Sequence, residues 1–115
     1  TGHISNEQLP RYLAAADALT YVSVFEGFGI PILEGMSSGT PVITSNVSSM
    51  PEVAGDAAIL IDPHDPKSIA AGMQEIISNE QLRQELITKG KERAKTFSWS
   101  GTAKHIYTEL KKIVK

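Results

Sequence analysis

The chain has 115 residues, of which 41% are hydrophobic and 21% are charged, and its formal net charge is −2. This length suits one small domain, and the composition excludes a disordered or fibrous protein and gives no sign of a nucleic-acid partner. The sequence contains no cysteine, which excludes disulfides, thiolate metal sites and a cysteine nucleophile.

Helices and strands alternate along the first part of the chain. Ser5 or Asn6 can cap a first helix, because short polar side chains accept bonds from free amides at a helix start. The apolar run that follows predicts a strand over residues 18–23. A glycine-containing loop leads from it into a short helix over residues 30–38, with Pro31 in the first turn, where proline is tolerated.

The same alternation continues further along the chain. A fully apolar strand at 41–44 and a helical turn at 51–54 precede a third strand at 58–61. Asp65 is predicted to cap the next helix, with Pro66 at its first position. The inner face of this helix is predicted to consist of Ile69, Met73, Ile76 and Ile77. A charged helix over about 80–95 and a last helix over about 99–114 complete the chain.

Short apolar strands that alternate with helices are typical of βαβ units around a parallel sheet. The expected fold is therefore α/β: a partial Rossmann-like domain with a short three-stranded parallel sheet and flanking helices. Because a doubly wound domain has about six strands, we expect this sheet to be incomplete on its N-terminal side. Residues 1–115 are expected to form one unit of a longer protein.

The segment at residues 25–31 is the strongest candidate for a binding loop. Its two glycines let the backbone turn tightly, and free amides at the following helix start suit a diphosphate or sugar hydroxyls. Because Pro31 has no amide proton, the candidate donors are the amides of Phe28, Gly29 and Ile30. On geometry alone, an ordinary strand-to-helix turn explains the loop equally well.

Two carboxylates strengthen the case for a polyhydroxylated ligand. Glu26 lies in the loop and Glu34 lies one helical turn after Ile30, so both can face the crevice at the strand ends. Carboxylate oxygens accept charge-assisted hydrogen bonds from sugar hydroxyls. Taken alone, Glu34 is more simply explained as a solvated helix residue.

The whole run at residues 22–65 resembles the donor-site segment of the family 4 type retaining glycosyltransferases, which have the GT-B architecture of two facing Rossmann-like domains. The matching features are the Glu-x7-Glu spacing of Glu26 and Glu34, the EGFGIP turn, GMSSGTPVI and MPEVAGDAAILIDP. The resemblance extends from about Gly2 to the C-terminus. It implies that this chain is the C-terminal, donor-binding part of such an enzyme.

The resemblance implies roles for the loop residues. Glu26 is the implied catalytic residue, beside the transferred sugar, and Glu34 is expected to accept from the ribose hydroxyls of the nucleotide. The implied donor-binding set is completed by four consecutive residues, Gly27, Phe28, Gly29 and Ile30. The implied donor is a UDP- or GDP-sugar, transferred with retention, and no metal or other cofactor is expected.

One departure from the family pattern limits what the chain is expected to do by itself. The Arg/Lys pair that clamps the diphosphate in this family lies upstream of the present sequence, as does the acceptor domain. We therefore expect weak donor binding and no transfer by the chain alone. The alternative is a non-catalytic nucleotide-sugar-binding or assembly module that another chain completes. An enzyme fragment is expected to self-associate through an unpaired strand edge and exposed apolar surface, whereas an independent module is expected to be monodisperse or to form a defined complex.

The expected location is the cytoplasm, because a chain without cysteine fits a reducing compartment. Contact with a membrane is expected only through segments that are not part of this sequence.

Residues 35–39 match the Gly-x-Ser-x-Gly motif of serine hydrolases. That motif must follow a strand and open a helix, whereas here it is expected to close a helix and precede a strand. A hydrolase is therefore not favoured.

Overall fold

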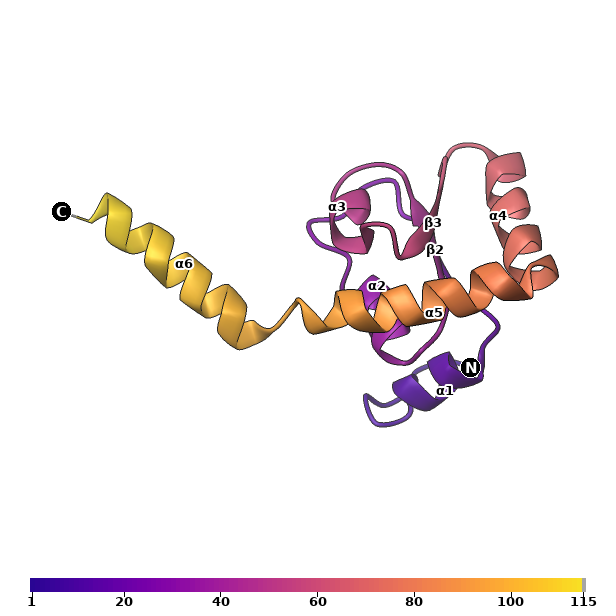
Figure 1. Cartoon of the computed structure of the whole chain (residues 1–115), viewed down its shortest axis with the longest axis horizontal. Helices are drawn as coiled ribbons and strands as arrows, with labels where there is room; N and C mark the ends of the chain where they lie inside the picture. Colours follow the sequence, from indigo (N-terminus) through magenta and orange to yellow (C-terminus); the bar gives the residue numbers. More distant parts are fainter. Residues whose placement is uncertain (115) are drawn as a thin grey trace.

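The computed structural model describes residues 1–114, in which three short strands alternate with helices and three further helices follow (Figure 1). In chain order the elements are α1 (Leu9–Ala15), β1 (Leu19–Tyr21), α2 (Ile30–Ser37), β2 (Val42–Ser45), α3 (Met50–Ala54), β3 (Ala58–Ile61), α4 (Pro66–Ser78), α5 (Glu80–Lys95) and α6 (Trp99–Ile113). The predicted order of elements is confirmed.

The three strands form one parallel sheet in the order β1-β2-β3. Leu19 lies opposite Val42 in the first pair of strands, and Val42 lies opposite Ala58 in the second. All four residues of the central strand β2 are buried, as expected for a parallel strand covered on both faces. The predicted α/β fold with a three-stranded parallel sheet is therefore correct.

Strand β1 is shorter than the predicted strand at 18–23, because side chains replace the backbone ladder after Tyr21. Thr44 Oγ1 donates to the Tyr21 carbonyl at 2.8 Å, and Ser45 Oγ donates to the Ser23 carbonyl at 2.6 Å. These hydroxyls satisfy the carbonyls without a paired strand, so the chain is able to turn into the loop that follows.

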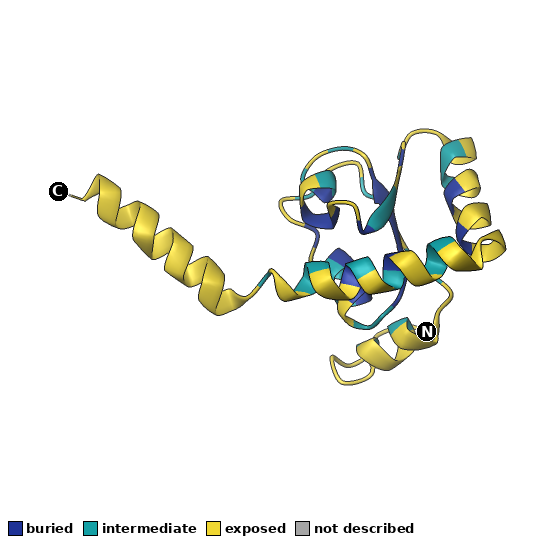
Figure 2. Ribbon diagram, in the orientation of Figure 1, coloured by how far each residue is buried: buried dark blue, intermediate teal, exposed yellow. Residues whose placement is uncertain are grey.

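The core has two parts, one on each face of the sheet. Successive residues of β2 point to opposite faces, so Val42 belongs to the part built with α2 and α3, and Ile43 belongs to the part built with α4 and α5. Figure 2 shows buried residues in the strands and on the inward faces of the helices around them. The sheet is therefore packed on both faces, and this packing fixes the position of its carboxyl edge.

The predicted inner face of α4 is half wrong. Ile76 is buried and Ile69 is half-buried, whereas Met73 is 41% exposed and Ile77 is 69% exposed. The reason is Gly72, which lies on the contact face: a Cβ at this glycine would be 3.0 Å from Ile61 Cγ2. The missing side chain lets the helix approach β3 closely, and that rotates Met73 and Ile77 away from the sheet.

Helix α6 extends away from the remainder of the molecule and is exposed along its whole length (Figures 1 and 2). Ser98 caps its start, with Oγ accepting from the Gly101 amide at 3.0 Å. Trp99 at its first turn is 82% exposed. Of the helices in the described part of the chain, none combines the length and apolar character that a membrane span requires.

Candidate functional site

The glycine loop, residues 25–30, joins the carboxyl end of β1 to the start of α2. Gly29 precedes the helix with φ of 100°, a left-handed backbone conformation that favours glycine. A Cβ at Gly29 would be 3.1 Å from Ile32 Cδ1, so the backbone also lies close to the side chain below it. Gly29 is therefore the residue that sets the entry of the chain into α2.

Three backbone amides at the start of α2 are free to bind a ligand. Within the described residues, the amides of Phe28, Gly29 and Ile30 have no hydrogen-bond acceptor. The first helix amide that does have an acceptor is that of Ile32, which donates to the Gly29 carbonyl at 3.0 Å. The positive end of the helix dipole lies behind these amides. The arrangement can bind an anionic or polyhydroxylated group.

Two serines of the next loop fix the backbone of the glycine loop. Ser48 Oγ accepts from the Glu26 amide at 3.1 Å and donates to the Glu26 carbonyl at 2.8 Å. Ser49 Oγ lies 2.9 Å from the Glu26 carbonyl and 3.0 Å from that of Phe28, so its single proton is shared between them. No local pattern marks these two serines as partners of the glycine loop, because serine is common in loops.

The Glu26 carboxylate is held by two hydroxyls at the end of β1. Tyr21 OH donates to Glu26 Oε1 at 2.5 Å, and Ser23 Oγ donates to the same oxygen at 2.8 Å. These bonds, that from Tyr21 first, hold the pKa of Glu26 below its usual value, although partial burial opposes them. The same bond is the main cause of the raised pKa of Tyr21.

Glu34 lines a groove of about 770 Å³ between α1, α2 and the turn that joins α5 to α6. This volume lies within the range of small-molecule sites, roughly 300–1,000 Å³. Most of the lining is apolar, and Glu34 is its only charged residue within the described part of the chain. The residues that line the groove are Asn6, Leu9, Pro10, Leu13, Phe28, Ile30, Leu33, Glu34, Ser37, Ser38, Phe97, Ser98, Trp99 and Thr102.

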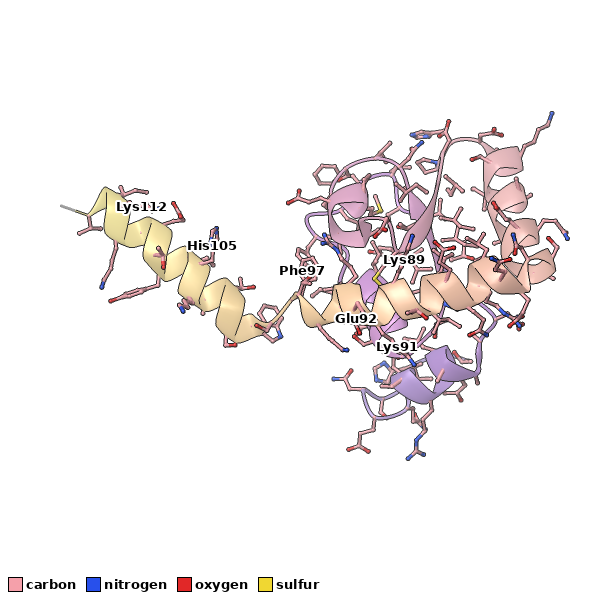
Figure 3. All side chains as sticks on the ribbon, viewed as in Figure 1. Lys89, Lys91, Glu92, Phe97, His105 and Lys112 are labelled. Atoms are coloured by element: carbon pink, nitrogen blue, oxygen red, sulfur yellow. The ribbon has the colours of Figure 1, made fainter. Side chains whose placement is uncertain are left out.

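An aromatic contact attaches the glycine loop to the turn between α5 and α6. Phe28 and Phe97 pack edge to face with ring centroids 5.7 Å apart. Figure 3 places Phe97 at this turn, where α6 departs. The guanidinium of Arg93 lies over the Phe97 ring and also donates to the carbonyls of Glu52 and Val53, at 2.6 and 3.0 Å. The contact of Phe28, Phe97 and Arg93 could not be predicted from the sequence, because these residues are far apart in the chain.

The predicted site residues fall into three neighbouring places. Phe28, Ile30 and Glu34 line the groove, while Gly27 and Phe28 line a second pocket of about 250 Å³. Glu26 lines neither of these and is fixed instead by its hydroxyl partners. Within the described residues, no group of three or more acidic or histidine side chains could hold a metal ion.

Residues 1–93 match the profile of the family described as glycosyl transferases, group 1. The chain belongs to this family. It corresponds to the C-terminal, Rossmann-like part of the family 4 type enzymes with GT-B architecture, as the resemblance in the sequence predicted.

Two glycosyltransferases illustrate the similarity. O-antigen chain mannosyltransferase B from Escherichia coli is 45% identical over 98 residues, which cover 85% of this chain and 26% of that protein. D-inositol 3-phosphate glycosyltransferase from Nocardioides sp. is 34% identical over 103 residues, which cover 88% of this chain and 22% of that protein. The chain therefore spans about a quarter of the length of these relatives.

A solved structure shares the fold. Sucrose-phosphate synthase from Thermosynechococcus elongatus superposes with a TM-score of 0.82 at 29% identity, over 98% of this chain and 29% of that chain. The match includes the α/β sheet and its flanking helices, since it covers almost the whole chain. It supports the Rossmann-like assignment independently of the sequence motifs.

Proposed function

We propose that this chain is the nucleotide-sugar-binding part of a retaining hexosyltransferase whose donor is a UDP- or GDP-sugar. One observation carries the proposal: in a member of this family, Glu34 is the only charged residue in the described lining of a groove that also contains Phe28 and Ile30. The free amides at the start of α2 adjoin this groove. A single carboxylate in an apolar groove suits a neutral polyol such as ribose.

Each group has a distinct role in this proposal. Glu34 accepts from the ribose hydroxyls, and the amides of Phe28, Gly29 and Ile30 bind the diphosphate and sugar hydroxyls. Glu26 binds hydroxyls of the transferred sugar and stabilises the positive charge that develops at its anomeric carbon. The departing nucleoside diphosphate is stabilised by preorganised donors and not by a metal ion, with a phosphate oxygen taking the acceptor proton.

The chain alone is proposed to bind the donor weakly and to transfer no sugar. Its relatives are about three to four times as long, since 98 aligned residues make up 26% of one and 103 aligned residues make up 22% of the other. The cationic side chains that neutralise the diphosphate and the residues that bind the acceptor belong, in this proposal, to the remainder of the protein. We place the protein in the cytoplasm, which suits a chain without cysteine.

Calorimetric titration tests the donor site. The chain is titrated with UDP and GDP, then with UDP-glucose and GDP-mannose, in buffer that contains EDTA. We expect one base to be preferred and the Glu34→Ala variant to bind about tenfold or more weakly, because a charge-assisted bond contributes about 1.5–3 kcal/mol. Glu75→Ala is the matched control, since Glu75 is an exposed residue of α4 outside the groove. Equal binding by wild type and Glu34→Ala would contradict the site.

The alternative is a non-catalytic assembly module completed by a second chain, and two exposed features favour testing it. Strand β1 pairs only with β2 in the described sheet, so its other edge is open, and α6 carries the exposed apolar residues Ile106, Leu110 and Ile113. Sedimentation velocity separates the two functions. A defined dimer that binds no nucleotide supports assembly, whereas a monomer that binds UDP or GDP supports the donor site.

A further inference from the structure

The two oxygens of the Glu26 carboxylate have different surroundings. Oε1 accepts from both Tyr21 OH, at 2.5 Å, and Ser23 Oγ, at 2.8 Å. Within residues 1–114, Oε2 accepts no hydrogen bond and the carboxylate forms no ion pair with a lysine or arginine. One oxygen is therefore fixed, while the other is open to a ligand.

The local backbone explains why both hydroxyls reach the same oxygen. Tyr21 is the last residue of β1 and Ser23 follows two positions later, so in extended chain their side chains point to the same side. The chain then turns, and Glu26 comes back over them with its amide and carbonyl held by Ser48. The carboxylate is thus fixed at its backbone and at one of its oxygens.

We propose that Tyr21 and Ser23 are positioning residues, which hold Oε1 so that Oε2 is kept available as the acceptor for a hydroxyl of the donor sugar. This role rests on the donor-binding function proposed above. Both partners are neutral donors, so they orient the carboxylate without cancelling its negative charge. A lysine or arginine in their place would orient the group but remove the charge that a developing cation needs.

Removal of one hydroxyl frees the carboxylate to rotate. In Tyr21→Phe, the ring remains to fill its place but Oε1 loses its shortest bond, and water takes that position. The fixed direction of Oε2 is then lost, while the groove that contains Glu34 is unchanged, since Tyr21 and Ser23 do not line it. We therefore expect weaker binding of the nucleotide sugar and unchanged binding of the nucleotide alone.

The first measurement needs no ligand. The carboxyl carbon of Glu26 is titrated by NMR in the full chain and in Tyr21→Phe, Ser23→Ala and Ser23→Thr. Because both hydroxyls stabilise the ionised form, we expect its pKa to rise in Tyr21→Phe and Ser23→Ala and to be largely restored in Ser23→Thr. Tyr12→Phe is the control, since Tyr12 is exposed on α1. An unchanged Glu26 pKa in a folded Tyr21→Phe overturns the positioning role.

The second measurement compares nucleotide sugars with nucleotides by calorimetry. We expect Tyr21→Phe and Ser23→Ala to weaken binding of UDP-glucose or GDP-mannose about three- to tenfold, with UDP or GDP binding unchanged and Ser23→Thr close to wild type. Equal losses for sugar and nucleotide, or no loss for either, overturn the positioning role. If wild type binds none of the four while Glu26 titrates as expected, the donor-binding function fails, and with it the role of Oε2.

Discussion

Phe28 of the glycine loop and Phe97 of the α5–α6 turn pack edge to face, with ring centroids 5.7 Å apart and ring planes at 85°. This contact joins two regions that both line the groove with Glu34. The direction in which α6 departs and the shape of the loop are consequently linked through one pair of rings. An edge-to-face pair of this kind adds about 0.5–1.5 kcal/mol beyond the area that it buries.

Phe97→Ala is expected to lower the free energy of unfolding by about 1–3 kcal/mol, because it removes this ring pair and the surface on which the Arg93 guanidinium lies. Denaturant unfolding followed by circular dichroism measures the loss. Phe25→Ala is the control, since Phe25 is 78% exposed, and we expect a change of about 0.5 kcal/mol or less. Similar losses in the two variants would show that the ring pair contributes nothing specific.

Gly72→Ala is expected to destabilise the fold although alanine favours helices. The added Cβ would meet Ile61 Cγ2 at 3.0 Å and the side chains of Ile43 and Ile59 at 3.4 Å, so these side chains or the helix must shift by a few tenths of an ångström. Overpacking of this kind costs about 1–3 kcal/mol. Gly27→Ala is the matched control, because a Cβ there meets nothing within 4 Å. A thermal midpoint that rises in Gly72→Ala would contradict the close packing.

Arg93→Ala is expected to destabilise the fold by about 1–3 kcal/mol, because it removes two charged hydrogen bonds to the last carbonyls of α3, those of Glu52 and Val53. Lysine cannot reproduce the forked geometry of the guanidinium, so Arg93→Lys should recover only part of the loss. Arg11→Ala, at an exposed position of α1, serves as the control in the same denaturant titrations. Full recovery by lysine would show that charge alone matters.

The bond between Tyr21 and Glu26 makes stability depend on pH. The folded-state pKa of Glu26 is lowered, so its contribution is present above the unfolded value of about 4.3 and is lost as pH falls through the folded pKa. A double-mutant cycle of Tyr21→Phe and Glu26→Gln isolates the coupling. We expect a stabilising coupling free energy between the two side chains at pH 6. We expect this coupling free energy to decrease once the pH falls below the folded-state pKa of Glu26. A coupling that is constant across this range would mean that the carboxylate charge plays no part.

Local signals predicted the cap residues only in part. The predicted cap of the first helix, Ser5 or Asn6, is wrong: α1 begins at Leu9, and its N-cap residue, Gln8, makes no side-chain cap bond. Asp65 caps α4 by accepting from the Lys67 amide at 2.9 Å, and Pro66 stands at the first helical position. The third strand and the charged helix α5 begin and end where the sequence predicted them. Such features depend on residues within one turn of each other, and sequence shows these directly. Residues 35–39 close α2 and precede β2, as expected, so they are not a hydrolase elbow.

The candidate site could be predicted only in part. Glu26, Glu34 and the free amides follow from the motif, and Glu34 does line the groove. The two hydroxyls on Glu26 and the serines behind the loop were not found, because tyrosine and serine at these positions are equally consistent with an ordinary strand and an ordinary loop. The roles assigned to Glu26 and Glu34 in donor binding stay predictions.

The sequence by itself determined the alternation of strands and helices, the cap of α4 and the glycine loop, because periodicity, proline, glycine and short polar residues act within a few positions. Only the tertiary structure decided which face of α4 meets the sheet, where β1 stops pairing, and that Phe97 lies against Phe28. These depend on how closely distant segments approach. That approach is set by the volumes of all the side chains between them, and no local pattern records it.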